Sequence, residues 1–211
     1  MNAPAYKLTV NNQSTSEGYV LIFLEKPDAS QPDMQTFAWQ SKFLYSDVEA
    51  DFSWELDWGF IWQQTNAVNA SQQIVPADLQ TKNQITLSYD ASHQAFHFSK
   101  PTQGASAGQL RIVEDSSVPI GMVDVGVALS GHPAFMVKSQ PNMTVAITPK
   151  PSYWLAFGNS ESKGPINVGE YTNAVKLQFP PNIYALTATI HPDKSITIEN
   201  TPLLVAKQPD L

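Results

Sequence analysis

The sequence predicts an all-β protein, an antiparallel β-sandwich of the Greek-key or jelly-roll type. Apolar and polar residues alternate in about thirteen short segments, as expected for strands with one buried face. Turn residues separate these segments at intervals of roughly 8 to 12 residues, which is typical of sandwiches and barrels. No stretch of about 12 residues has the 3.6-residue period of a helix, and 16 prolines are spread along the chain.

The first half of the chain holds the strands that are richest in aromatic residues. Tyr19–Leu24 is apolar at every position, so we expect a central strand covered on both faces. Loops rich in Asp, Asn, Ser and Pro are expected at Glu25–Asp33, Ser46–Asp51 and Asn66–Ser71. The expected strands are Tyr6–Val10, Tyr19–Leu24, the aromatic-faced Phe37–Tyr45 with an interruption near Ser41, Phe52–Trp62, the edge strand Gln72–Val75, and the hairpin Ile85–Tyr89 and Phe96–Phe98.

The second half also consists of short alternating segments separated by turns, but it contains fewer aromatic residues. Turns are expected at Ser130–Pro133 and His191–Lys194, and a polar loop at Gly158–Gly169. The tail from Thr201 is expected to be loose or an edge. The expected strands are Leu110–Val113, Val123–Leu129, Ala134–Lys138, Met143–Thr148, Tyr153–Phe157, Val175–Phe179, Tyr184–Ile190 and Ser195–Glu199.

The longest strand signal is Phe52–Trp62. Every second residue is large and apolar, whereas Glu55 and Asp57 lie on the opposite parity. The apolar face has three interpretations: the core of the sandwich, an exposed platform for a sugar or partner protein, or a membrane-inserting face. The net negative charge counts against the membrane, and large aromatic residues dominate protein cores. We therefore expect this strand to form the core.

Pro101–Gly108 is the segment most similar to a linker, because small and polar residues fill it. Asn83–Tyr89 resembles Asn173–Phe179, and each of the two follows an aromatic strand. Strand periodicity alone also generates such likeness. The expected organisation is one sandwich domain over residues 1–211, with a pseudo-repeat of residues 1–100 and 109–211, joined near 101–108, as the alternative.

Composition limits the classes of partner and the compartment. The formal net charge is −7 and only 15% of the residues are charged. Nucleic acids and anionic membranes require a basic surface, so neither is expected as a partner. The chain has no cysteine, which excludes disulfides, thiol catalysis and cysteine-ligated metals. The N-terminal segment shows no secretion-signal pattern, so we expect a cytoplasmic protein.

No residue pattern indicates catalysis or a cofactor. His93 and His97 lie four residues apart, about 13 Å on a strand, which is too far for one metal ion. Glu55 and Asp57 lie within roughly 7 Å on a strand, a separation used by glycosidases, but the neighbouring tryptophans face the other side. There is no Gly-x-Ser-x-Gly motif and no phosphate-binding glycine loop. We expect a protein that is not an enzyme and carries no cofactor.

Two groups of residues are candidates for a binding site. Acidic residues cluster in two loops, where solvated turns are the ordinary interpretation and calcium binding the alternative. The aromatic candidates outside the long strand could together form an exposed platform that binds a sugar or a partner protein. The acidic candidates are Asp28, Asp33, Asp47, Glu49 and Asp51, and the aromatic candidates are Trp39, Tyr153 and Trp154.

Several segments, most of them rich in aromatic residues, are similar to segments of one known family: Phe37–Trp39, Phe52–Trp62, Pro76–Tyr89, Gln140–Met143, Tyr153–Gly158 and Phe179–Tyr184. In these segments the chain resembles the bacterial RhiA family of rhizosphere-expressed proteins. The resemblance implies an abundant cytoplasmic protein under cell-density control in plant-associated bacteria. It implies no reaction and no catalytic residues.

The function expected from these observations is non-enzymatic binding or self-assembly in an accessory role. The expected partner is another protein or further copies of the same chain. A lectin-like carbohydrate-binding sandwich is the first alternative, and a membrane-active, toxin-like β protein is the second.

Overall fold

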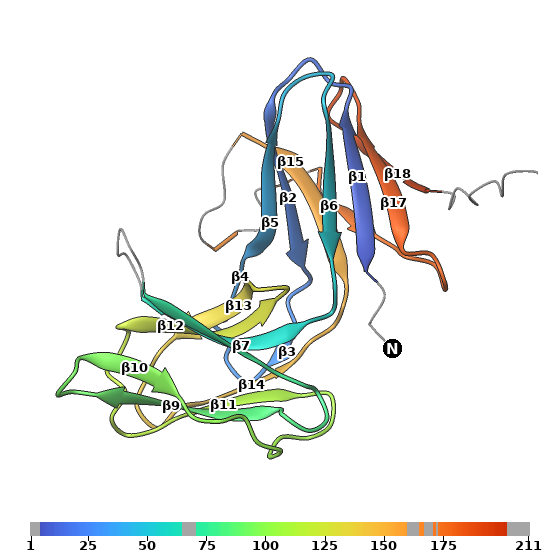
Figure 1. The fold of residues 1–211 in the computed structure, drawn as a ribbon. Coiled ribbons are helices and arrows are strands. Elements are labelled where there is room, and N and C mark those ends of the chain that lie inside the picture. Colours follow the sequence, from blue (N-terminus) through green and yellow to red (C-terminus); the bar gives the residue numbers. More distant parts are fainter. Residues whose placement is uncertain (1–4, 65–70, 160–164, 167–170, 172, 202–211) are drawn as a thin grey trace, which may run out of the picture.

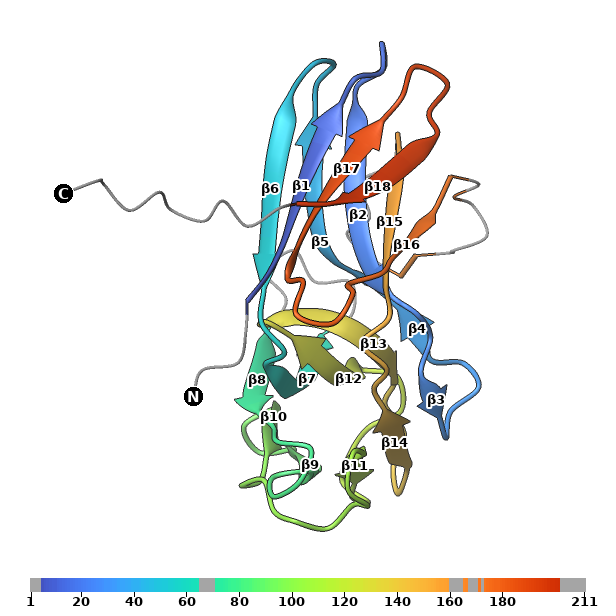
Figure 2. The same ribbon diagram turned by 90° about the vertical axis from the view of Figure 1, so that its right-hand side faces the viewer.

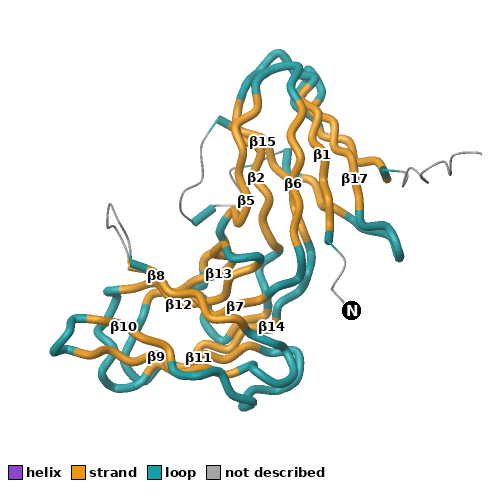
Figure 3. The backbone as a smooth tube through the Cα atoms, in the orientation of Figure 1, coloured by secondary structure: helices purple, strands orange, loops and turns teal. Residues whose placement is uncertain are grey.

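The computed structural model describes residues 5–64, 71–159, 165–166, 171 and 173–201. These residues form eighteen strands and no helix, which confirms the predicted all-β class. The strands make four sheets that pack in pairs as two sandwiches (Figure 1, Figure 2 and Figure 3). Most of the predicted loop Asn66–Ser71, most of the predicted loop Gly158–Gly169 and the tail after Thr201 lie outside the described residues.

The upper sandwich of Figure 1 consists of two four-stranded sheets. Trp54 on one sheet contacts Trp39 and Tyr153 on the other, with ring centroids 5.3 and 5.1 Å apart, so aromatic side chains fill the space between the sheets. The strand orders are β18 (Ile196–Asn200), β17 (Ala185–Ile190), β1 (Tyr6–Asn12) and β6 (Glu49–Trp54), and β16 (Val175–Leu177), β15 (Tyr153–Gly158), β2 (Gly18–Leu24) and β5 (Ala38–Leu44).

The lower sandwich consists of two five-stranded sheets. Trp62 packs on Phe96 and Phe60 on Phe98 across its core, with ring centroids 5.6 and 6.5 Å apart. The strand orders are β10 (Ala95–Phe98), β9 (Gln84–Asp90), β11 (Leu110–Glu114), β14 (Thr144–Thr148) and β3 (Asp28–Ala29), and β4 (Gln35–Thr36), β13 (His132–Lys138), β12 (Val123–Leu129), β7 (Trp58–Gln64) and β8 (Gln72–Pro76).

The two sandwiches share one arrangement of strands. Apart from the short edge strands β3 and β4, β10-β9-β11-β14 corresponds to β18-β17-β1-β6, and β8-β7-β12-β13 corresponds to β16-β15-β2-β5. Among the described strand pairs only β1–β17 and β9–β11 are parallel, and they hold the same place in their sheets. The remaining described pairs are antiparallel, as the sequence predicted.

The predicted long strand Phe52–Trp62 is in fact two strands, and the prediction of one continuous strand is wrong. Phe52 and Trp54 end β6 in the upper core, whereas Trp58 begins β7 in the lower core. The chain crosses between the sandwiches at Glu55, whose N–H donates a hydrogen bond to Ser130 Oγ at 3.2 Å. The even-numbered aromatic residues are buried on both sides of the crossing, and in β7 Gly59 and Ile61 of the other parity are buried as well.

The predicted linker Pro101–Gly108 connects β10 to β11, two strands of one sheet. Asn83 is fully buried and holds this connection through four hydrogen bonds of 3.0 to 3.2 Å to the backbone of Gly104, Ala105 and Ser106. The segment is therefore fastened to the sheet. The pseudo-repeat of the two halves stays a prediction.

The described part of the chain has no helix of the length and hydrophobicity that a membrane span needs.

Candidate functional site

An exposed row of aromatic rings lies at the upper end of the upper sandwich. Tyr19 of β2 contacts Phe43 of β5 with ring centroids 5.0 Å apart, and Phe43 contacts Tyr45 at 5.1 Å. Phe43 is 40% exposed and Tyr45 is 61% exposed. Both contacts are edge-on, at 75° and 79°, which is a favourable arrangement of aromatic rings. We call these three residues the aromatic strip.

A β-bulge determines which aromatic residues of the predicted strand Phe37–Tyr45 reach the surface. The register of β2 against β5 shifts between Ile22 and Phe23, so β5 carries one extra residue there. Trp39 lies at this shift and points into the core, with 2% exposed, whereas Phe43 faces solvent. The prediction that the aromatic residues of this strand share one face is therefore wrong, since a bulge reverses the alternation.

A polar cavity of about 670 Å³ lies beside the strip, and we call it the tip pocket. Asn173 donates hydrogen bonds to the carbonyls of Phe157 at 2.9 Å and Lys194 at 3.3 Å, which fixes one wall. Ser195 Oγ donates to Asp193 Oδ1 at 2.6 Å, and this bond lowers the pKa of Asp193 below its ordinary value. The lining residues are Phe157, Gly158, Asn159, Tyr171, Asn173, Ala174, Val175, Asp193, Lys194, Ser195 and Ile196.

The aromatic strip and the tip pocket are neighbours on one sheet. Gly158 lines the pocket and is the register partner of Tyr19 across the β15–β2 pair. A side chain at Gly158 would meet the ring of Tyr171 at 3.2 Å, so the glycine leaves room for that ring at the pocket wall. The combined site presents aromatic rings next to amide, carboxylate, ammonium and hydroxyl groups, which suits a ligand with both apolar faces and polar edges.

Of the three aromatic residues that the sequence proposes as a binding platform, the structure brings Trp39 and Tyr153 together, with ring centroids 6.3 Å apart, and places Trp154 elsewhere. Trp39 and Tyr153 are each 2% exposed and lie in the core of the upper sandwich, where burial raises the pKa of Tyr153 to about 12. Trp154 is half-buried and lines a second cavity of about 610 Å³. The ammonium group of Lys176 lies 5.9 Å from the Trp154 ring and pairs with Glu25 at 2.9 Å.

The acidic candidates lie at opposite ends of the molecule. Asp28 belongs to β3 in the lower sandwich, where it pairs with Lys150 at 2.8 Å, and Asp33 is exposed nearby in sequence. Asp47, Glu49 and Asp51 lie in or after the β5–β6 turn at the top of Figure 1. Asp51 pairs with Lys7 at 3.0 Å. No group of three or more His, Asp or Glu residues in the described part of the chain has the geometry of a metal site.

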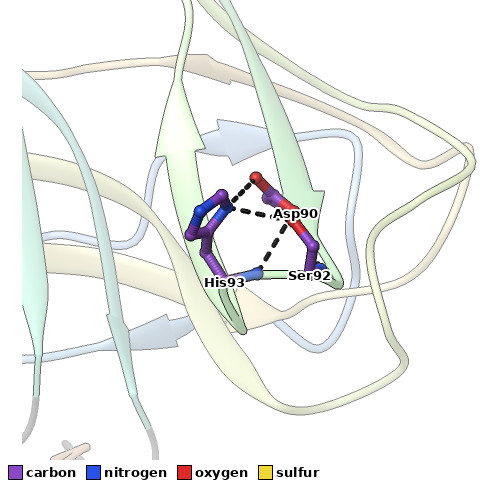
Figure 4. A network of polar contacts seen from close by, with 3 residues as sticks. All are labelled: Asp90, Ser92 and His93. Carbon is purple, nitrogen blue, oxygen red and sulfur yellow. Dashed lines mark hydrogen bonds and ion pairs between the residues drawn. The ribbon is translucent and has the colours of Figure 1, made fainter.

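Figure 4 shows the β9–β10 turn, where aspartate, serine and histidine side chains meet. Asp90 Oδ2 and Ser92 Oγ both contact Nδ1 of His93, at 2.7 and 3.0 Å, and Ser92 Oγ also donates to Asp90 Oδ1 at 2.6 Å. A catalytic triad needs the serine on Nε2 and the carboxylate on Nδ1. This arrangement instead closes a turn, and the bonds from Ser92 and His93 lower the pKa of Asp90 to about 2.

Glu55 and Asp57, the carboxylate pair noted in the sequence, line an open depression of about 460 Å³ between the sandwiches, together with Trp54 and Ser130. Both carboxylate side chains are exposed. A general acid of a glycosidase instead sits in apolar surroundings that keep it protonated.

Sequence reasoning missed the aromatic strip and the tip pocket. Phe43 and Tyr45 were recognised as strand aromatics, but the bulge that exposes Phe43 has no signal in the alternation. The pocket joins the end of β15, the residues before β16 and the β17–β18 turn, and no local pattern brings these segments together.

Comparisons with known proteins identify the family. The RhiA family model matches residues 3–201. Protein RhiA of Rhizobium leguminosarum bv. viciae is 25% identical over 204 residues, which covers 90% of this chain and 84% of that protein. No solved structure matches the chain. Because the family model spans nearly its whole length, the chain belongs to the RhiA family.

Proposed function

We propose that the protein is a non-enzymatic binding protein and that the aromatic strip and the tip pocket together bind a carbohydrate. One observation carries the proposal. Tyr19 and Phe43 pair across β2 and β5 three residues before the bulge, and the corresponding pair in the lower sandwich, Asp124 and Lys138, is an ion pair at 2.9 Å.

Comparing the two corresponding pairs shows which residues the fold requires at this position. The same register position is filled by a carboxylate and an ammonium group in one sandwich and by two aromatic rings in the other. The fold therefore does not require aromatic residues there. Since exposed aromatic surface also favours unwanted association, its presence at Phe43 and Tyr45 supports a binding role.

The chemistry of the site supports a sugar as the ligand. A pyranose ring has C–H groups on its faces and hydroxyl groups around its rim. Aromatic rings pack against such faces, and side chains such as Asn173, Asp193 and Ser195 exchange hydrogen bonds with such rims. The tip pocket, at about 670 Å³, falls within the ordinary size range of small-molecule sites.

The geometry of the polar clusters supports a non-enzymatic role. The Asp90–Ser92–His93 contacts place the serine on the wrong imidazole nitrogen for a triad. The carboxylates Glu55 and Asp57 are exposed. A general acid or base ordinarily needs an environment that tunes its pKa toward the working pH.

The test is a glycan array, followed by isothermal titration with each glycan that binds. We expect at least one hit, and at least a tenfold weaker affinity for Tyr45→Ser, which removes an exposed ring without touching the core. Asp124→Ser is the matched control in the lower sandwich and should bind like the wild type. An array without a hit, or equal affinities for Tyr45→Ser and wild type, would contradict the proposal.

Self-association through the same strip is the second candidate function. Phe43, Tyr45 and Val48 are exposed by 40%, 61% and 43%, and they lie in or next to the β5–β6 hairpin. Sedimentation equilibrium distinguishes the candidates: dimers that Tyr45→Ser converts to monomers indicate self-association, whereas a monomer at millimolar concentration excludes it.

We also propose that the protein acts in the cytoplasm, supported by the complete lack of cysteine, and that it binds neither nucleic acid nor anionic membranes, supported by the net charge of −7. Cell fractionation tests the location, and recovery in the periplasmic or extracellular fraction would contradict it.

A further inference from the structure

The two halves of the chain both contribute to both sandwiches. The first half supplies β1 to β10 and the second half supplies β11 to β18, with Pro101–Gly108 between them. We infer that the chain is a fusion of two structurally equivalent halves that have exchanged strands, and that each half binds the other so extensively that the joint at Pro101–Gly108 is dispensable.

The first evidence is that every sheet is built from both halves. Leaving aside β3 and β4, each sheet takes two strands from the first half and two from the second. The halves meet in the middle of each sheet, at the pairs β1–β17, β2–β15, β7–β12 and β9–β11. The interface is therefore a set of central strand pairs with apolar faces on the inside, which resembles an obligate interface more than a contact between separate domains.

The second evidence is agreement in register between the sandwiches. In the upper sandwich Leu8 pairs with Leu186 on one side and Phe52 on the other. In the lower sandwich Ile112 pairs in the same way, with Ile85 and Val145.

The bulges agree as well. The β2–β5 register shifts after Ile22, and the β12–β13 register shifts after Val127, each the fifth residue of its strand. Bulges are local departures from regular pairing and occur at particular places in a fold. Matching bulges at matching positions therefore indicate that the two sandwiches share more than a general strand order.

The third evidence is that corresponding turns use the same side-chain contacts. After β1, Asn12 Oδ1 accepts hydrogen bonds from the N–H and Oγ of Ser14, at 3.1 and 2.7 Å. After β11, Asp115 Oδ1 accepts the same two bonds from Ser117, at 2.8 and 2.5 Å. The side chains thus close corresponding turns with one hydrogen-bond pattern.

The turns that close the outer hairpins repeat a second pattern. Asp90 accepts from the N–H and Oγ of Ser92 at 2.9 and 2.6 Å, and Asp193 accepts from Ser195 at the same two distances. The β5–β6 and β13–β14 turns each contain a left-handed residue, at Asp47 and Asn142, with φ of 58° and 59°. Asp-x-Ser is a common turn sequence, and its two aspartates hold different places, Asp90 at the end of β9 and Asp193 three residues after the end of β17, so equivalence of the halves rests on the strand order, the registers and the bulges.

The joint itself is short and lies on the surface. Ser106 and Ala107 are exposed, and a side chain at Gly108 would have no neighbour within 4 Å. The hydrogen bonds of the Asn83 side chain reach only Gly104 to Ser106. A cut after Ser106 therefore leaves these side-chain contacts within the first half and removes no strand pair between the halves, and the bond from the Arg111 N–H to the Asn83 carbonyl stays as one of the contacts between them.

The test cuts the folded full-length protein at the joint. A recognition sequence for a site-specific protease is inserted between Ser106 and Ala107, and the uncleaved insertion variant is the control for the insertion. After cleavage we expect one particle with the mass of the intact chain in native mass spectrometry at about 1 µM, because strand-exchanged interfaces of this kind bind tightly.

A second measurement uses dilution. Unfolding of the cleaved protein should become concentration-dependent, because two chains then separate, whereas unfolding of the uncleaved control should not. Fragments separated in urea should restore the native far-UV circular dichroism only when mixed. Two half-size folded particles after cleavage would overturn strand exchange, and loss of the β spectrum on cleavage, with the uncleaved control intact, would overturn the dispensable joint.

Discussion

Replacing Glu114 with glutamine should remove a pH dependence of stability that one buried carboxyl group creates. Glu114 ends β11 and is 1% exposed. The N–H of Gln140 donates to its Oε2 at 2.9 Å, and its Oε1 has no hydrogen-bond partner among the described residues. Burial raises the pKa of Glu114 from 4.5 to about 7, although the Gln140 bond opposes the rise.

The sign follows from proton binding. Between pH 4.5 and pH 7 the folded state keeps the proton of Glu114 while the unfolded chain loses it, so the free energy of unfolding decreases as the pH rises. One pKa unit corresponds to about 1.4 kcal/mol, so the loss between pH 4 and pH 8 is about 3 kcal/mol. Glu114→Gln keeps the acceptor for Gln140 and is uncharged at every pH, so it should escape this loss.

The assay is urea unfolding followed by tryptophan fluorescence, at pH 4, 5, 6, 7 and 8. The difference in free energy of unfolding, variant minus wild type, should increase by about 3 kcal/mol from pH 4 to pH 8, with most of the increase between pH 5 and pH 7. Glu199→Gln, at an exposed position of β18, is the control and should show a flat difference within about 0.5 kcal/mol. A Glu114→Gln curve parallel to the wild type would refute the reasoning.

Three further predictions concern named positions. Gly126→Ala should lower the free energy of unfolding by about 3 kcal/mol or more, because the new Cβ would lie 1.9 Å from the carbonyl oxygen of Phe135. Gly108→Ala should lower it by only about 1 kcal/mol, through the backbone φ of 81° at that position. Equal urea midpoints for the two variants would contradict this difference. Asn83→Ala should cost about 2 kcal/mol in urea unfolding, because it removes a fully buried side chain together with its hydrogen bonds to the backbone at 104–106, and a cost below about 0.5 kcal/mol would be inconsistent with those bonds. Ser92→Ala should raise the NMR titration midpoint of Asp90 from about 2, since Ser92 gives the largest contribution to the shift, and an unmoved midpoint would disprove that cause.

Local alternation was sufficient to locate most strands. Leu8 and Val10 on β1, and Ile85 and Leu87 on β9, are fully or almost fully buried, as their parity predicted. The continuous apolar character of Tyr19–Leu24 predicts a central strand, and β2 does lie inside its sheet. These predictions succeed because successive side chains of a strand point to opposite faces, so the burial of one face appears directly as alternation in the sequence.

Alternation could not show which strands pair. β1 pairs with β17, about 180 residues later in the chain. The register of such a pair depends on how the complete apolar faces of the two strands fit together, which the local sequence of either strand does not show. The Phe52–Trp62 alternation continues through Glu55–Asp57, so it hid the crossing between the sandwiches. The candidate site depends on the bulge near Trp39 and on the distant turn at Asp193, neither of which leaves a periodic signal.

The proposed carbohydrate site requires that Tyr19 and Phe43 bind a ligand and that the fold does not depend on their rings. The double variant Tyr19→Asp/Phe43→Lys gives the upper sandwich the ion pair that Asp124 and Lys138 form in the lower one. Measured by isothermal titration with a glycan bound by the wild type, the variant should lose at least tenfold in affinity while its free energy of unfolding stays within about 1 kcal/mol. Wild-type affinity in a folded double variant would contradict the claim.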